Sequence, residues 1–157
     1  MERIAKFYKV DRSEYDKNGK SGYDEIALPT RATSGSAGYD FFAPEAFTLE
    51  PNESITVPTG VRVKIEDGWM LQIFPRSGLG FKYRLTLDNT VGIIDSDYFY
   101  AENQGHIFIK MTNCGSSPLT VEKGKAFAQG IFVKYGITAD DRADGKRTGG
   151  FGSTDAE

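Results

Sequence analysis

Residues 56–65 read Thr-Val-Pro-Thr-Gly-Val-Arg-Val-Lys-Ile, and this stretch decides the class of fold. From Val61 to Ile65, apolar and basic side chains alternate. A period of two places the apolar side chains on one face of a β-strand. The Pro-Thr-Gly sequence just before them is a turn signal. The stretch therefore predicts a turn that leads into a half-buried strand.

Similar segments recur along the chain. A more buried strand is predicted over residues 70–74, an alternating strand over 107–111 and another apolar run over 127–133. Turn residues separate these segments, and no long stretch has the 3.6-residue period of a helix. We therefore expect an all-β fold, a jelly-roll-like antiparallel β-barrel or sandwich. One short helix is expected after Pro75, with Ser77 as its N-cap.

The length of 157 residues is that of one domain. We expect a single β-rich domain over residues 1–138 and a flexible, glycine-rich C-terminal arm over 139–157. A polar stretch over residues 11–23 is expected to be weakly structured. The sequence contains no internal repeat.

Composition excludes several classes of function. The formal net charge is −3, which argues against general binding of nucleic acids, since that requires clustered basic side chains. The single cysteine excludes an intramolecular disulfide and fits a reducing compartment. The N-terminus does not resemble a signal peptide, and no apolar run is long enough to cross a membrane. We expect a cytoplasmic protein in which a few local cations would bind any anionic ligand.

The stretch Gly92-Ile93-Ile94-Asp95-Ser96-Asp97-Tyr98 is the most informative for function. If the strand continues through it, Asp95 and Asp97 point to the same face, where two like charges repel each other unless a cation offsets them. The alternative is a strand end that runs into a polar turn, in which Asp and Ser are ordinary residues.

Other constellations combine donors suited to an anion. Arg76-Ser77-Gly78 offers a guanidinium fork and a hydroxyl, or else an ordinary helix cap. The tail from Arg147 to Thr154 combines glycines, hydroxyls and one aromatic ring, or else is plain disorder. Asp40 follows a glycine and Gln129 interrupts an apolar run. With one histidine, a His-rich zinc site within one chain is excluded, and Mg²⁺ suits the oxygen-rich sequence better.

Five segments, in order, resemble the motifs of the trimeric dUTPase family. They are Ala-Gly-Tyr-Asp at 37–40, Pro-Arg-Ser-Gly at 75–78, residues 89–98, residues 124–129 and residues 147–154. The resemblance implies a homotrimer with active sites shared between subunits and Mg²⁺-dependent hydrolysis of dUTP to dUMP and pyrophosphate. Such an enzyme keeps uracil out of DNA and supplies dUMP for thymidylate synthesis.

The resemblance also implies a role for each motif. Asp95 would be the general base that activates water for attack on the α-phosphorus, and Asp40 would support the hydrated metal through water. The arm would close over the bound nucleotide. The implied substrate-binding residues are Arg76, Ser77, Gly78 and Gln129 for the phosphates, Asn89, Gly92, Ile93 and Ile94 for uracil, Tyr98 for the deoxyribose, and Arg147, Phe151, Gly152, Ser153 and Thr154 in the arm.

The chain departs from the family pattern at three places. Six residues, Phe99 to Gln104, precede Gly105 where the family commonly turns back within two residues. Ala126 stands where many members carry Arg, and Asp155 where Gly is common.

Two alternatives are kept: a dCTP deaminase-like enzyme of the same fold, and a dUTP-responsive binding or regulatory protein. Ammonia release from dCTP would identify the first, and tight dUTP binding with little turnover the second.

Overall fold

The computed structural model describes residues 1–19, 21–145, 147, 149 and 150, and most regular structure in them is β-strand. The elements, in chain order, are β1 (Ala5–Lys9), α1 (Arg12–Tyr15), η1 (Tyr23–Glu25), β2 (Thr30–Arg31), β3 (Tyr39–Phe42), β4 (Phe47–Leu49), β5 (Ser54–Pro58), β6 (Val61–Ile65), β7 (Trp69–Pro75), α2 (Ser77–Tyr83), β8 (Leu85–Leu87), β9 (Gly92–Ile94), η2 (Ser96–Tyr100), β10 (Phe108–Asn113), β11 (Leu119–Val121) and β12 (Ala126–Lys134).

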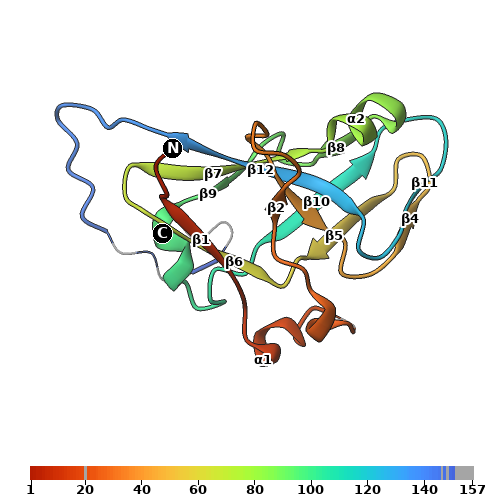
Figure 1. Cartoon of the computed structure of the whole chain (residues 1–157), viewed down its shortest axis with the longest axis horizontal. Coiled ribbons are helices and arrows are strands. Elements are labelled where there is room, and N and C mark those ends of the chain that lie inside the picture. The colour runs from red at the N-terminus through yellow and green to blue at the C-terminus, as the bar shows by residue number, and fades with distance from the viewer. Residues whose placement is uncertain (20, 146, 148, 151–157) are drawn as a thin grey trace.

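The strands form two main sheets in which every pairing is antiparallel. The larger sheet has the order β2-β3-β12-β7-β9, and the second has the order β5-β10-β8. Two further strand pairs, β1-β6 and β11-β4, flank them (Figure 1). This arrangement agrees with the all-β architecture predicted from the sequence.

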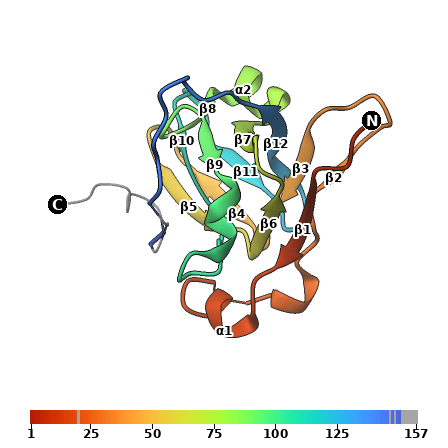
Figure 2. The ribbon, with the colours of Figure 1, turned by 90° about the vertical axis from the view of Figure 1, so that its left-hand side faces the viewer.

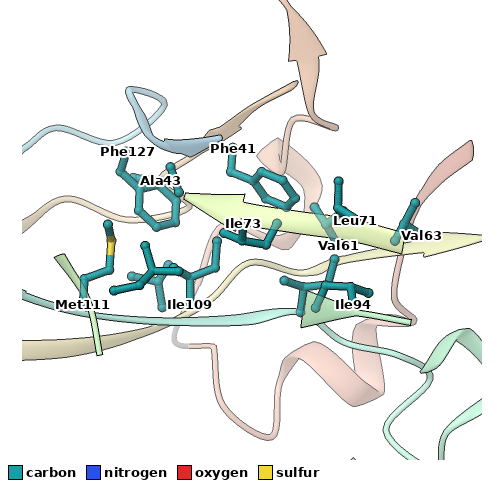
Figure 3. Close-up of a cluster of buried hydrophobic side chains, with 14 of the residues drawn as sticks. Phe41, Ala43, Val61, Val63, Leu71, Ile73, Ile94, Ile109, Met111 and Phe127 are labelled. Carbon is teal, nitrogen blue, oxygen red and sulfur yellow. The ribbon is translucent and has the colours of Figure 1, made fainter. Parts of the chain in front are cut away.

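The core lies between the sheets. Figure 3 shows Ile73 of the larger sheet next to Ile109 of β10, with Phe41 and Met111 elsewhere in the same cluster. All four side chains are buried. Burying each large aliphatic or aromatic side chain contributes about 1.5–3 kcal/mol to folding, so this cluster is what holds the sheets face to face.

The strands predicted from alternation and from apolar runs are confirmed. In β6 the valines and Ile65 are buried while Lys64 is exposed. The predicted strand at 70–74 lies within β7, the one at 107–111 overlaps β10, and the apolar run at 127–133 lies within β12. Alternation therefore placed β6 and β10, and apolar runs placed β7 and β12.

The helical segments differ in detail from the expectation. The short helix after Pro75 exists as α2, but its N-cap is Arg76, and Ser77 is its first residue. The expectation of weak structure over residues 11–23 was wrong, because α1 lies there and buries Glu14 and Tyr15. Among the described residues, no helix is long and apolar enough to cross a membrane.

Candidate functional site

The connection between β8 and β9 joins the two main sheets. Strand β8 pairs with β10 in the second sheet, whereas β9 pairs with β7 at the edge of the larger one. The connecting turn contains Asp88 and Asn89, and Thr90 adopts a left-handed conformation with φ of 65°. Asp and Asn favour such turns because their short side chains bond to nearby backbone groups. The turn thus holds Asn89 at the junction between the sheets.

A pocket of about 410 Å³ opens beside this turn. Asn89, Gly92 and Ile94 contribute to its lining, together with apolar side chains of β7, β8 and β10. Gly92 fits closely there, since an added Cβ would lie 3.1 Å from the Cβ of Ile73, and Ile73 would have to shift to make room. The alternation in β9 buries Gly92 and Ile94 and exposes Ile93. The pocket has the mixed polar and apolar lining that suits a small flat ligand.

Asp95 lies directly after β9, where the strand ends. It is the N-cap of η2, so the strand-end alternative is the observed conformation. The carboxylates of Asp95 and Asp97 nevertheless face one cation: Arg147 Nη2 is 2.7 Å from Asp95 Oδ2 and its Nε is 2.9 Å from Asp97 Oδ1. The Arg147 side chain is only 14% exposed. The guanidinium fork therefore offsets the repulsion between the two carboxylates.

Tyr98 is held under this ion pair. It is buried, and its hydroxyl donates a hydrogen bond of 2.7 Å to the carbonyl oxygen of His106. The same hydroxyl accepts a bond of 2.9 Å from Asn103 Nδ2. The Arg147 guanidinium lies 5.6 Å from the centre of the ring. Burial raises the pKa of Tyr98, so the hydroxyl keeps its proton. We call Asn89, Asp95, Asp97, Tyr98 and Arg147 the hairpin cluster.

A second group of predicted residues gathers where β3, β7 and β12 lie side by side. Gln129 pairs with Asp40 on one side and with Phe74 on the other. Its Nε2 donates a hydrogen bond of 3.1 Å to the carbonyl oxygen of Pro75. The Nε of Arg76 lies 3.3 Å from Asp40 Oδ1. We call Gly38, Asp40, Arg76, Ser77 and Gln129 the strand-end cluster.

Asp95 of the hairpin cluster and Arg76 of the strand-end cluster lie at opposite ends of β7. Ile94 pairs with Leu71, so Asp95 lies near the start of this strand, across from Met70. Arg76 follows the last residue of β7. Six residues of extended strand span roughly 20 Å. One subunit therefore does not bring Asp95 and Arg76 to the same ligand atom.

The described part of the C-terminal arm contains no helix or strand after β12. It runs away from the sheets and returns near η2 (Figures 1 and 2). Arg147 is the arm residue brought to the hairpin cluster. The predicted ligand contacts of Phe151, Gly152, Ser153 and Thr154 lie outside the described residues.

The carboxylates of the two clusters are the candidate metal ligands. Among the described residues, no three His, Cys, Asp or Glu side chains cluster as metal ligands. Asp40 pairs with Arg76, and Asp95 and Asp97 pair with Arg147. Mg²⁺ needs no cage of protein ligands, since it keeps several waters and is commonly held by one or two carboxylates and substrate phosphates. The residues present fit a hydrated Mg²⁺ that arrives with a phosphate ligand.

Comparisons with known sequences identify a family. A profile of the dUTPase family matches residues 24–155. The deoxyuridine 5'-triphosphate nucleotidohydrolase of Lactococcus lactis is 40% identical over 134 residues, which cover 83% of this chain and 89% of that protein.

Solved structures are similar as well. The dUTPase from Streptococcus mutans, known from a crystal structure, has 33% sequence identity to this chain and a TM-score of 0.68. The match covers 84% of this chain and 97% of the Streptococcus mutans chain. The dUTPase of Staphylococcus bacteriophage 80alpha, in a structure with dUPNHPP, has 21% sequence identity to this chain and a TM-score of 0.69. The match covers 99% of this chain and 100% of the bacteriophage chain. This last likeness concerns the fold alone.

Proposed function

Because this chain belongs to the dUTPase family, we propose that it hydrolyses dUTP to dUMP and pyrophosphate. The observation that carries the proposal is the order of features along residues 89–98. Asn89 lines the pocket, the edge strand β9 follows it, and the half-exposed carboxylate of Asp95 comes directly after β9. This order suits a ligand with a base at one end and a phosphate chain at the other.

The uracil ring would bind beside the turn. Among the described strands, β9 pairs only with β7 and is the edge of the larger sheet. An edge strand presents a row of backbone N–H and C=O groups. Uracil has one N–H donor between two carbonyl acceptors, so the backbone of Gly92, Ile93 and Ile94 and the Asn89 amide can read its edge. Tyr98 would pack on the deoxyribose.

Asp95 would act as the general base. Its side chain is 48% exposed, so it can contact a water molecule in front of the α-phosphorus. The carboxylate accepts a proton from this water as the oxygen attacks. The bond from the α-phosphorus to the bridging oxygen breaks, and pyrophosphate leaves. A positioned base of this kind typically contributes about 10²–10⁴-fold to the rate. Asp97 would have a structural role in holding the turn.

The strand-end cluster would bind phosphates. Arg76 supplies a fork of charged donors, and Ser77, Gly78 and Gln129 supply hydroxyl, backbone and amide donors. Asp40 would contact the hydrated Mg²⁺ through water. When bound, Mg²⁺ would neutralise charge on the triphosphate.

We propose that the active site is shared within a homotrimer. The separation of roughly 20 Å along β7 supports this, because a nucleotide at Asp95 would need Arg76 from another subunit. A shared site also explains how a single domain, here assigned to residues 1–138, surrounds a nucleotide without a deep pocket of its own. The arm, residues 139–157, would close over the nucleotide, with Arg147, Ser153 and Thr154 near the γ-phosphate and Gly152 and Phe151 over the uracil.

Pyrophosphate release tests the proposed activity directly. The purified protein would be incubated with dUTP, dCTP, dTTP or UTP, each with and without Mg²⁺, and ammonia release from dCTP would be followed in parallel. We expect rapid release from dUTP with Mg²⁺ and much slower release from the others. Absence of release from dUTP under these conditions would refute the proposal, and ammonia from dCTP would assign the chain to deaminases instead.

A further inference from the structure

The segment Phe99–Gln104, which lengthens the turn between Tyr98 and Gly105, is firmly attached to the domain. The Phe99 carbonyl oxygen accepts a hydrogen bond of 2.6 Å from Arg62 Nη2, and the Arg62 guanidinium lies 3.6 Å from the centre of the Phe99 ring. At the other end, Gln104 Oε1 accepts from the backbone N–H of Asp11, and Gln104 Nε2 donates to Asp11 Oδ2, both at 2.9 Å. The segment is anchored at both ends.

Asn103 uses this anchored position to hold Tyr98. Its Nδ2 donates to the Tyr98 hydroxyl at 2.9 Å, while its Oδ1 accepts from the Gly105 backbone N–H at 3.1 Å. The His106 carbonyl oxygen accepts from the same Tyr98 hydroxyl. The hydroxyl is therefore fixed by one donor and one acceptor, and both come from the turn that follows η2.

The arm also passes against Asn103. A Cβ atom added at Gly150 would lie 3.2 Å from Asn103 Nδ2, and Arg147 lies over the Tyr98 ring. Asn103 thus contacts the proposed sugar-packing residue and lies next to the arm that covers it.

We propose that Asn103 is a positioning residue that sets the preference for deoxyribose over ribose. This inference rests on the proposed function. A ring packed on the sugar excludes a 2′-hydroxyl only if it cannot tilt or shift to make room. Because its hydroxyl is hydrogen-bonded to Asn103 and to the His106 carbonyl oxygen, the Tyr98 ring is held in one position. Without the Asn103 donor, the Tyr98 ring could move away from the 2′-hydroxyl of a ribose. The value of kcat/KM for UTP would then rise relative to the value for dUTP.

The test measures kcat/KM for dUTP and for UTP in Asn103→Leu. Leucine is close to asparagine in size, but it offers neither a donor to the Tyr98 hydroxyl nor an oxygen that could accept from it. We expect the ratio of the two kcat/KM values to narrow about tenfold, the effect of one lost hydrogen bond to a buried group. The matched control is Glu102→Gln, which changes an exposed side chain of the same segment and leaves both of its anchors intact. It should leave the ratio unchanged.

A double-mutant comparison separates positioning from general damage. In a Tyr98→Phe background the hydroxyl is absent, so adding Asn103→Leu should not change the dUTP-to-UTP ratio further. An equal change in both backgrounds, an equal loss for dUTP and UTP, or the same effect from Glu102→Gln would each overturn the proposal. Failure of the proposed function would look different, since the wild-type protein would then not hydrolyse dUTP at all.

Discussion

The hairpin cluster and the strand-end cluster are built in opposite ways. Most of the hairpin cluster comes from one continuous stretch, Asn89 to Tyr98, whose order along the chain is also its order in space. The strand-end cluster is assembled from β3, the end of β7 and β12, which are distant in sequence and adjacent only through sheet register. The first is positioned by a turn and a strand end, and the second by the pairing of three strands.

This difference has a consequence for catalysis. Neither cluster alone carries both a base and a set of phosphate donors, and Asp95 and Arg76 lie at opposite ends of β7. In our account the hairpin cluster supplies the chemistry and the recognition of the nucleoside, and the strand-end cluster supplies phosphate binding to a neighbouring subunit. The two clusters should therefore respond differently to substitution.

The largest effect is expected at Asp95. Asp95→Asn keeps the shape of the side chain and removes the base, so kcat should fall about 10³-fold. The affinity for a non-hydrolysable dUTP analogue should change much less, because the base makes little contact in the ground state. Single-turnover pyrophosphate release and equilibrium titration measure the two quantities.

Asp97→Asn is the matched control for Asp95→Asn. It removes the other carboxylate that contacts Arg147, at a side chain that is 54% exposed. Exposed ion pairs contribute up to about 1 kcal/mol, so kcat should stay within about fivefold of wild type. A larger loss at Asp97 than at Asp95 would show that the base has been assigned to the wrong residue.

We expect the folded protein to become less stable in acid, because of His106 beside the hairpin cluster. His106, whose carbonyl oxygen binds Tyr98, is fully buried, and its Nε2 accepts from the Gly60 backbone N–H. Burial lowers the pKa of His106 to about 4, against the opposing influence of Glu14 at 3.8 Å. The unfolded chain, with a histidine pKa of about 6.5, binds a proton that the folded chain does not. The free energy of unfolding therefore falls, by up to about 3 kcal/mol, as pH drops from about 6.5 to about 4.

Urea unfolding at pH 7 and at pH 5 measures this contribution. His106→Gln should show a shallower pH dependence than wild type, whatever its absolute stability. If both proteins lose the same free energy of unfolding between these pH values, His106 is not responsible for the acid sensitivity.

The smallest effect is expected at Gly38, in the strand-end cluster. A Cβ added there would lie 2.6 Å from Gln129 Oε1, so the Gln129 side chain would have to move from its bond to Pro75. Because that side chain is flexible, we expect Gly38→Ala to raise KM for dUTP by several-fold with little change in kcat. Gly35→Ala is the control, since an added Cβ meets nothing within 4 Å there. Equal KM values for dUTP in the two variants would contradict the proposed role of Gln129 in phosphate binding.

The sequence predicted the parts of the molecule that depend on local pattern. Alternation placed β6 and β10, and apolar runs placed β7 and β12, because burial of one face or of both leaves a direct signature in a strand. The position of Asp95 at a strand end could also be anticipated, since the apolar run stops there.

Contacts between distant segments could not be predicted in the same way. The pairing of Arg147 with Asp95 and Asp97 joins residues about fifty positions apart, and a flexible glycine-rich stretch carries no periodicity that places it. The burial of Tyr15 in α1 was missed because its neighbours in sequence are polar. The attachment of Gln104 to Asp11 likewise depends on where the N-terminal segment lies in the fold.

Subunit complementation tests the central claim, that the two clusters meet only between subunits. Asp95→Asn and Arg76→Ala would each be assayed alone and after co-expression in one cell, with the oligomer verified by its mass in solution. Each variant alone should be nearly inactive. If every site takes Asp95 from one subunit and Arg76 from another, the whole population of trimers assembled at random from equal amounts of the two variants should recover about a quarter of the wild-type rate. Mixed trimers with no recovered activity would contradict the account, because every site built within one subunit would still carry a lesion.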